Sequence, residues 1–509
     1  MHPSAPDATR VARLNQCFPS RLARGCTLAV ALLLGGCATF RSYDKELNST
    51  LSQASSGNVN GAIGTLDANN RGKNKDLLYY FELGELQRLD DRYEDSRKAW
   101  TSANERVQKW EAAAKADPAR VLGDAASLVL NDKSRPYEGH DYEKVMLTTR
   151  MAMDFLAMND FENARVAIKQ THEREAVIAA LRAKELNEVE SDAKKRGART
   201  SFKELNGYPV QSIDNPQVNA LKNSYQSALS HYLAGFIYEA LGEGSLAAPG
   251  YRQAIELQPH QPMLEEALRG LDQRIAQPSD GLTDVLFLVE SGWAPARISR
   301  EFPLPIPVNN TLVLLPISFP VIKATPGPAA PTGLQVDGGE TRPVAPITSI
   351  DLMARRALKD EMPGIMLRAA IRSAAKGATQ YALQHQANNR DNGWLTLAAI
   401  AVTIGSVVTE SADERTWRTL PSEIAIARAR IPPGVHSVAL QTGAGVRTVQ
   451  INVSGRYAVI GLRLLPYHLF LQAPAVAPVN VAPSLPQPPS TPAPPATLEE
   501  PAPTTEVPK

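Results

Sequence analysis

The stretch HYLAGFIYEALGEGSLAAPGYRQAIELQP, residues 231–259, decides the fold predicted for the first half of the chain. Its apolar residues recur at helical spacing on both sides of the turn Gly242-Glu243-Gly244. Small residues such as Gly235 and Ala247 would let two helices approach, and Tyr251 would fill the space between them. Pro259 would end the second helix, because proline lacks an amide hydrogen and clashes with the preceding turn. The stretch therefore predicts a pair of packed helices.

Two earlier stretches, residues 77–107 and 143–172, repeat this register around the turns Asp90-Asp91-Arg92 and Asn159-Asp160. These are the spacings of the tetratricopeptide repeat, a helix-turn-helix unit of about 34 residues that stacks on its neighbours. We therefore expect tetratricopeptide-like helical repeats over residues 77–280. The matching positions are Leu83, Gly84, Tyr93, Ser96, Trp100 and Ala103 in the first copy, and Met151, Ala152, Phe155, Phe161, Ala164 and Ile168 in the second.

A charged stretch, residues 173–195, separates the second copy from the third. Its many charges predict a solvated helical arm, and the alternative is a partner-binding helix. Residues 113–130 and 263–275 are expected to cover the exposed ends of the stack, because terminal repeats need capping.

The chain after residue 280 is predicted to be rich in strands, at 282–289, 311–315 and 319–323, with a Pro/Gly-rich loop over 324–346. Pro316 and Pro320 indicate edge strands, because proline cannot donate to a strand ladder. Polar and apolar residues alternate over 448–454, which predicts a small antiparallel β unit within residues 412–471. Residues 458–462 are apolar on both faces, as a central strand would be.

Between these strands, residues 351–411 are expected to be a helical segment that breaks near Pro363-Gly364. Arg368, Arg372 and Lys376 lie four apart and would share one helix face. That face is a candidate contact for an anion or a glycan, and the alternative is a solvated or ion-paired face. Residues 394–408 carry no charge but are too short to span a membrane, so a buried helix or hairpin is expected, with membrane contact as the alternative.

The start of the chain predicts export and lipidation. Arginines precede a short apolar run at 26–34, and Leu34-Gly35-Gly36-Cys37 has the form of a lipoprotein cleavage box. Cys37 is the last of three cysteines, so the mature chain would keep one thiol, at its first residue. Ala38 follows, where a lipoprotein of the inner membrane usually carries aspartate. We therefore expect a lipid anchor in the outer membrane, facing the periplasm. The alternative is an ordinary signal peptide with a chance cysteine.

The end of the chain, residues 472–509, consists largely of proline, alanine and threonine, which predicts a disordered tail. The whole is expected to be an α+β multidomain protein with helical repeats, a β-rich C-terminal region with a helical insert, and this tail. The expected regions are a signal peptide (1–36), a membrane-proximal segment (37–76), the repeats (77–280), strands with the Pro/Gly loop (281–350), the helical segment (351–411), the β unit (412–471) and the tail (472–509).

Composition and motifs exclude several functions. The net charge is +1, without the clustered basic excess of a nucleic-acid-binding surface. The sequence has no H-E-x-x-H, C-x-x-C, G-x-S-x-G or P-loop pattern, and its histidines are scattered. No catalytic residue, cofactor or metal site is therefore predicted, and an enzyme is not expected. Asp413, Arg415 and Trp417 are interpreted as an ion pair beside a packed tryptophan at the start of the β unit, with a functional site as the alternative.

Four stretches give the chain a resemblance to a family of proteobacterial tetratricopeptide lipoproteins that has no assigned activity. The resemblance covers most of the mature chain and implies a role in the cell envelope. The stretches are Pro136-Tyr137-Glu138-Gly139 with residues 142–147, residues 289–295, Arg368 with Arg372 and Lys376, and Asp413, Arg415, Trp417, Leu420 and Pro421.

The predicted function is a protein-interaction scaffold, because stacked helical repeats create an extended concave surface. Phe155, Tyr232 and Tyr238 are the candidate contacts with an envelope protein. The alternative is a module that binds glycan or peptidoglycan through the β unit and the face of Arg368, Arg372 and Lys376. An enzyme with a cryptic site is a third possibility.

Overall fold

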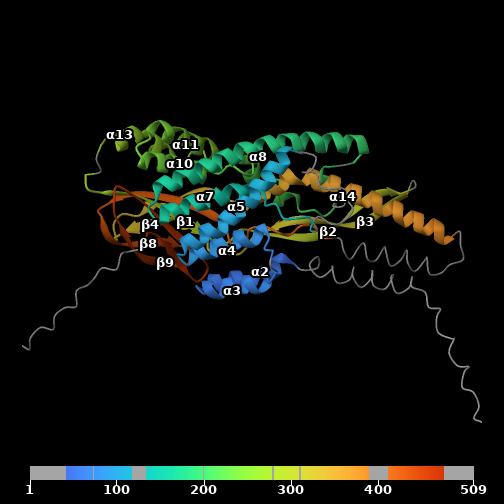
Figure 1. Ribbon diagram of the computed structural model, residues 1–509, viewed down its shortest axis with the longest axis horizontal. Coiled ribbons are helices and arrows are strands. Elements are labelled where there is room, and N and C mark those ends of the chain that lie inside the picture. Colours follow the sequence, from blue (N-terminus) through green and yellow to red (C-terminus); the bar gives the residue numbers. More distant parts are fainter. Residues whose placement is uncertain are drawn as a thin grey trace, which may run out of the picture. The chain divides into compact units, whose positions relative to one another are not determined.

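The computed structural model describes residues 42–72, 74–116, 133, 135–198, 200–277, 280–308, 311–388 and 411–474. Within them the chain has a mixed α+β fold, with helices in the first half and strands mainly in the second (Figure 1). The helices are α2 (Tyr43–Ser55), α3 (Val59–Asn69), α4 (Leu77–Leu89), α5 (Tyr93–Ala116), α7 (Asp141–Ala157), α8 (Phe161–Arg196), α9 (Pro216–Ala220), α10 (Ala228–Ala240), α11 (Gly244–Leu257), α12 (Pro262–Arg269), α13 (Leu271–Ala276) and α14 (Ile350–Asn388). The strands are β1 (Thr283–Ser291), β2 (Ala296–Val308), β3 (Thr311–Lys323), β4 (Gly333–Val336), β5 (Arg342–Pro343), β6 (Ala345–Ser349), β7 (Glu423–Ile431), β8 (Gly434–Thr442), β9 (Gly445–Val453), β10 (Tyr457–Leu464) and β11 (Leu469–Gln472).

The helix pairs α2–α3, α4–α5, α7–α8 and α10–α11 are joined by turns of one geometry. Each turn has a residue with positive φ at the same position: Gly57 (88°), Asp91 (56°), Asn159 (59°) and Gly242 (78°). The next amide then donates to a carbonyl in the last turn of the first helix, which closes that helix. The last three pairs coincide with the three pairs predicted from the sequence. The first lies in residues 37–76, where the sequence predicts none.

Two of the pairs, α4–α5 and α10–α11, also have a close contact at the same distance from the turn. A Cβ built on Gly84 would lie 2.1 Å from the indole nitrogen of Trp100, and one on Gly235 would lie 2.6 Å from the ring of Tyr251. Both rings are fully buried between their two helices. The glycines therefore make room for the large side chains that fill the pairs.

Gly235→Ala should lower the free energy of unfolding by about 1–3 kcal/mol, because the added methyl group overpacks the contact with Tyr251. Gly64→Ala is the matched control: Gly64 lies inside α3 with open space around its Cα, so alanine should stabilise the helix by up to about 1 kcal/mol. Urea unfolding followed by circular dichroism measures both changes. Equal effects at the two positions would contradict this packing.

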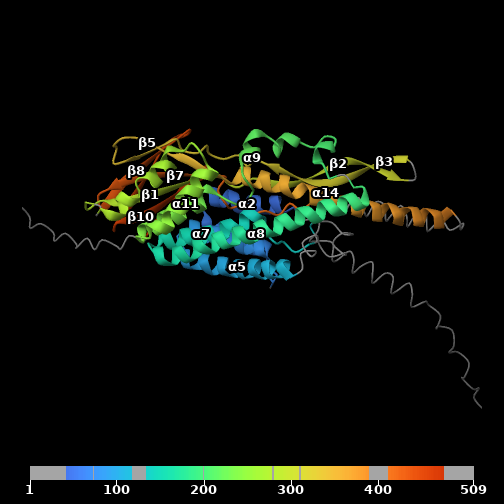
Figure 2. The same ribbon diagram turned by 90° about the horizontal axis from the view of Figure 1, so that it is seen from above.

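The central sheet, β11-β10-β1-β7-β6, lies between the helices and a second sheet, β5-β4-β8-β9. Strand β1 is buried along its whole length. Val285, Phe287 and Val289 pack with the second sheet, whereas Leu286 and Leu288 belong to the core that the helices share. Figure 2 shows α5, α7 and α8 on one side of these strands. The chain's own sheet therefore covers this side of the helical array, and one hydrophobic core joins helices and strands.

The β unit predicted over residues 412–471 is not self-contained. Strands β7 and β10 flank β1, antiparallel and parallel respectively, whereas β8 pairs with β4 on one side and with β9 on the other. Strands β4 and β5 come from the predicted loop at 324–346, and they are too short for their sequences to show a period. Residues 458–462 are buried on both faces as predicted, and their strand β10 lies inside the sheet, between β11 and β1.

Two helical predictions are also wrong. Helix α14 runs through Pro363-Gly364 without a break, because Leu358, Met362 and Ile365 are buried in one core on both sides of the proline. The charged stretch 173–195 is not a solvated arm. It continues α8 to Arg196, and its Val189 and Ala193 pack against Leu367 of α14.

Residues 311–315 and 319–323, predicted as two strands, form the single strand β3. It pairs with β2 in a two-stranded sheet, so Pro316 and Pro320 lie on an edge strand as predicted. The signal peptide with Cys37, residues 117–130, the uncharged run 394–408 and the tail beyond residue 474 lie outside the described residues. None of the helices in the described ranges has the length and apolar character needed to span a membrane.

Candidate functional site

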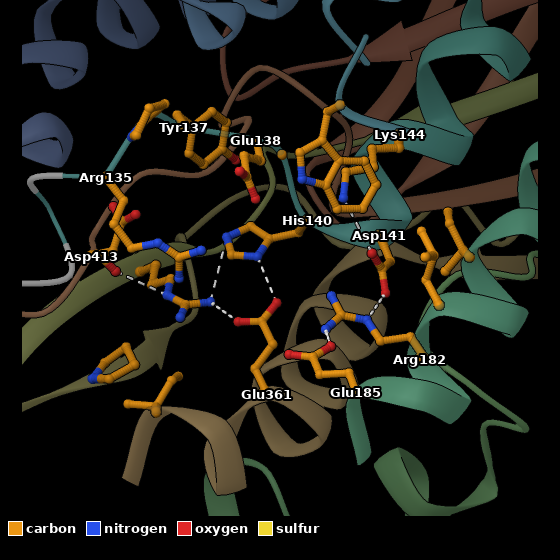
Figure 3. A pocket seen from close by; sticks show the side chains of 18 of the residues that line it. Arg135, Tyr137, Glu138, His140, Asp141, Lys144, Arg182, Glu185, Glu361 and Asp413 are labelled. Carbon is orange, nitrogen blue, oxygen red and sulfur yellow. Dashed lines mark hydrogen bonds and ion pairs between the residues drawn. The ribbon is translucent and has the colours of Figure 1, made fainter. Parts of the chain in front are cut away.

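A cavity of about 140 Å³ lies where the helical array meets the hairpin β2–β3 and α14 (Figure 3). Its walls come from the segment before α7, from α5, α7 and α8, from β2 and β3, from α14 and from the segment before β7. Six basic and five acidic side chains line it: Arg135, His140, Lys144, Arg182, Arg297 and Arg368, with Glu138, Asp141, Glu185, Glu361 and Asp413.

One side of the cavity is a group of three residues, the buried Arg297 and the partly buried His140 and Glu361. His140 Nδ1 lies 2.8 Å from Glu361 Oε1, and Arg297 Nη1 donates to Glu361 Oε2 at 2.9 Å. Burial alone would lower the pKa of His140, but Glu361 outweighs it and raises that pKa above its ordinary value. Burial would raise the pKa of Glu361, but His140 and Arg297 together hold it well below its ordinary value. Glu361 is therefore ionised at neutral pH.

The opposite side is formed by α7 and α8. Arg182 donates to Asp141 through Nε and to Glu185 through Nη1. Lys144 Nζ lies 3.5 Å from Asp141 and 3.4 Å from the centre of the Trp110 ring. Burial would raise the pKa of Asp141, but Arg182 and Lys144 lower it, and burial lowers the pKa of Lys144. Trp110, Ile178, Leu181 and Ile365 add an apolar wall.

Glu143 holds the wall segments in place from behind. This fully buried carboxylate accepts the amide of His140 at 2.9 Å and the amide of Trp417 at 2.7 Å. It also accepts the hydroxyl groups of Tyr137 and Thr416. Glu143 therefore joins the segment before α7 to the segment before β7, although the two lie far apart in sequence.

The structure brings together several residues that the sequence singled out. Residues 136–139, Arg368 and Asp413 all line the cavity. Asp413 and Arg415 form the predicted ion pair at 2.7 Å, and Trp417 is fully buried as predicted. Asp413 nevertheless also faces the cavity, which the ion-pair interpretation did not foresee.

Other candidate residues do not form the surfaces expected of them. Tyr232 is fully buried between α10 and α11, so it cannot contact a partner, whereas Phe155 and Tyr238 are half-buried. Arg372 is also buried and does not share an open face with Arg368, and the side chain of Lys376 lies outside the described residues. Both arginines are engaged within the chain. The predicted basic face is therefore reduced to Arg368 at the rim of the cavity.

The main charged residues of the cavity were missed from the sequence. Asp141, Arg182, Arg297 and Glu361 lie on four different elements, and no short motif joins them. The sequence carried one local signal of this site. His140 precedes α7 and Glu143 follows three residues later, which is the spacing of a capping box.

Glu361→Gln should lower the pKa of His140, because burial and Arg297 would then act without the opposing carboxylate. In the native protein, His140 contributes stability that is present below its unfolded pKa of 6.5 and is lost as pH rises through its raised folded pKa. Glu361 contributes stability that is present above its unfolded pKa of 4.5 and is lost as pH falls through its lowered folded pKa. The variant should therefore lose most stability between pH 4.5 and pH 6.5, where both contributions are present in the native protein. An NMR titration of the His140 ring, with thermal unfolding across the same range, measures both effects.

The control is Asp360→Asn, because Asp360 pairs with Arg356 on the outer side of α14 and should leave the His140 titration unchanged. A His140 ring that titrates identically in the native protein and in Glu361→Gln would contradict the assigned pair.

No group of histidine, cysteine, aspartate or glutamate side chains within the described ranges is arranged to hold a metal ion. The cavity can instead offer paired charges and an apolar wall to a small polar ligand. Comparisons with protein-family models, with curated proteins and with solved structures find no match to this chain.

Proposed function

We propose that the chain is an envelope protein that works by binding, and that its cavity takes an amino-acid-sized ligand with a carboxylate group. The observation that carries this proposal is the lining itself, in which basic and acidic side chains surround a small space beside an apolar wall. An arginine guanidinium has five donors in a fixed fork and is well suited to a carboxylate. We assign Arg182 to it: its Nε and Nη1 donate to Asp141 and Glu185, and its Nη2 group would bind the ligand.

The size of the cavity supports this ligand class. A cavity of about 150 Å³ holds one benzene molecule. The present one, at about 140 Å³, suits an amino acid or the terminal residue of a peptide rather than a sugar chain. The acidic side chains, Glu138 among them, would favour a ligand that also carries an amino group. The peptide part of peptidoglycan offers such ends, so this proposal is a narrower form of the peptidoglycan alternative.

Binding is favoured over catalysis by the residue types present. The cavity lining, within the described part of the chain, holds no serine, threonine or cysteine to act as a nucleophile beside His140. Arg297 helps to keep Glu361 ionised, and Glu361 raises the pKa of His140 above its ordinary value, so His140 is less available as a neutral base near neutral pH.

Thermal unfolding in the presence of free amino acids tests the proposal. A panel of the common L-amino acids with D-alanine and D-glutamate, at millimolar concentration, should contain at least one that raises the Tm, because a ligand of the folded state stabilises it by mass action. Arg182→Gln should abolish the increase. Lys195→Gln on the same helix should retain it, since Lys195 is exposed and pairs with Asp192 at the surface. An unchanged Tm with every member would reject this ligand class.

A second candidate function is a contact with another envelope protein through tetratricopeptide-like pairs. Its support is a set of exposed apolar side chains on the outer helices, Val166 (52% exposed) and Leu246 (51%). Phe155 and Tyr238 are half-buried on the same helix pairs, and the Arg165–Glu243 ion pair joins α8 to the turn between α10 and α11. A photoreactive residue at Tyr238 should then give one discrete protein adduct in cells. The cavity proposal predicts no adduct there.

The anchor and location rest on Cys37 and Ala38 in the sequence. We infer an outer-membrane lipoprotein that faces the periplasm. Mass spectrometry of the purified mature protein should find an acylated Cys37 at its first position, and a soluble product cut at another residue would reject the anchor.

A further inference from the structure

Of the lysines in the described ranges, Lys144 is the one that is buried, with 1% of its side chain exposed. It lies on α7 and lines the cavity together with Arg182. Figure 3 shows its amino group directed to Asp141, with Arg182 on the other side of that carboxylate. A buried lysine at a cavity is in the position of those that react with the carbonyl group of a bound ligand.

The amino group of Lys144 is only weakly paired. Its Nζ lies 3.5 Å from Asp141 Oδ1, whereas an ion pair of this kind usually measures about 2.7–2.9 Å. The centre of the Trp110 ring lies 3.4 Å from the same nitrogen. Burial, together with the nearby Arg182, lowers the pKa of Lys144 more than Asp141 raises it. A larger fraction of the amine is therefore neutral, and the neutral amine is the nucleophile.

Asp141 places two groups where one small ligand can use both. Its Oδ1 faces Lys144 and its Oδ2 accepts from Arg182 Nε, so the amine and the guanidinium lie at the two oxygens of one carboxylate. Arg182 Nη1 donates to Glu185, and Nη2 is the group assigned to the ligand. An α-keto acid carries its carboxylate next to its carbonyl carbon. Its carboxylate can therefore meet Arg182 while its carbonyl carbon lies beside Lys144.

The size and the charge of the cavity also suit an α-keto acid. A volume of about 140 Å³ is enough for a keto acid of amino-acid size. The lining holds six basic and five acidic side chains, so it has one excess positive charge when every group is ionised. The ligand's carboxylate balances this charge. Ile178 and Leu181, which belong to the apolar wall, would contact its side chain.

We propose that Lys144 binds an α-keto acid covalently in this cavity, as an imine, while Arg182 holds the ligand's carboxylate. This rests on the proposed function, because it uses the same cavity and the same arginine, and it adds a covalent step. Lys144 Nζ attacks the carbonyl carbon, a carbon–nitrogen bond forms, and the carbonyl oxygen leaves as water. An ammonium ion and a ketone thus give an iminium ion and one water molecule, without an oxidant or a reductant.

The contacts of Lys144 stabilise the product as well as the free lysine. The iminium ion keeps the positive charge of the ammonium ion, so Asp141 and the face of the Trp110 ring act on both. The buried wall also limits the access of water, which would hydrolyse the imine. Covalent binding therefore leaves the charges of this wall unchanged.

Reductive trapping on the purified full chain tests the proposal. The probe is pyruvate with cyanoborohydride, which reduces an imine to a stable secondary amine. Peptide mapping by mass spectrometry measures the modified fraction of each lysine over time. The internal reference is Lys195, which is 71% exposed and lies on the same helix as Arg182. Lys144 should be modified faster than Lys195, although it is the less exposed of the two.

Acetone is the matched probe, because a methyl group replaces the carboxylate of pyruvate. The rate at Lys144 divided by the rate at Lys195 corrects for the different reactivities of the two ketones. This ratio should be about tenfold higher with pyruvate than with acetone, as expected for a hydrogen bond to a charged group. Lys144→Met should lose the fast modification and retain the slow one at Lys195. Circular dichroism shows whether the variant is folded, and the mapping on the native protein does not depend on it.

Modification of Lys144 no faster than that of Lys195 would overturn the covalent step. Equal ratios with pyruvate and acetone would overturn the contact between the carboxylate and Arg182. The outcome is separable from that of the proposed function. A Tm raised by an amino acid, with Lys144 unmodified by pyruvate, rejects the imine alone. Fast modification of Lys144 by pyruvate, with no amino acid raising the Tm, supports the imine and rejects amino acids as ligands.

Discussion

Arg150→Met should lower the free energy of unfolding by about 3–5 kcal/mol, because it leaves buried carboxylates without their partner. Arg150 lies on α7 and reaches Glu290 of β1 and Glu85 of α4, the latter at 3.2 Å. All three side chains are completely buried, and Arg463 of β10 lies 3.7 Å from Glu290. This charged cluster sits at the junction of helices and central sheet, so its loss should affect both.

Urea unfolding followed by circular dichroism measures the change. Arg92→Met is the matched control, because Arg92 pairs with Asp95 at the surface with 41% of its side chain exposed. Arg92→Met should change the free energy of unfolding by no more than about 1 kcal/mol. If Arg150→Met and Arg92→Met lower the free energy of unfolding by the same amount, the buried cluster does not stabilise the junction.

Trp417→Ala should also lower the free energy of unfolding by about 3–5 kcal/mol, as expected for a large aromatic residue removed from a core. The Trp417 ring stacks on Phe81 of α4 with centroids 4.5 Å apart, and it meets the Trp100 ring edge-on at 6.0 Å. Its indole N–H donates to Thr419 Oγ1 at 3.0 Å. One side chain from the segment before β7 therefore fills the first predicted helix pair.

The control for Trp417 is Tyr467→Ala, because Tyr467 lies between β10 and β11 with 77% of its surface exposed. Its replacement should change stability by no more than about 0.5 kcal/mol. A loss below 1 kcal/mol for Trp417→Ala would mean that the helices hold their core without the later segment.

The helix pairs could be predicted because their signals are local. Gly84 with Trp100 and Gly235 with Tyr251 are separated by one turn, and the turn residues Asp91, Asn159 and Gly242 are types that tolerate positive φ. The pair α2–α3 has the same turn at Gly57, but its apolar residues match the tetratricopeptide spacing less well than those of the other three pairs. Strand β1 could be predicted from its continuous apolar run.

The arrangement of the sheets and the cavity could not be predicted in the same way. Strand β1 is flanked by β7 and β10, and no local pattern specifies which strands pair across so long a separation. The Glu361 and Arg297 partners of His140 become neighbours only when α14 and β2 pack beside α7. For the same reason Tyr232 looked accessible on a single helix pair and is covered once the array is complete.

Helices and sheets share one core, so the chain's own sheet fills the side of the array on which a partner was expected. Phe236 of α10 illustrates this, because its ring meets Tyr457 of β10 at 5.6 Å and Arg428 of β7 at 5.0 Å.

Urea unfolding of the full chain, followed by two probes in one titration, tests this claim most directly. Far-ultraviolet circular dichroism reports the helices, and a dye on Val446→Cys, in the chain without its three native cysteines, reports the second sheet. A shared core predicts coincident transitions, since one cooperative unit unfolds as a whole. A helical signal that persists at urea concentrations where the dye already reports an unfolded sheet would contradict it.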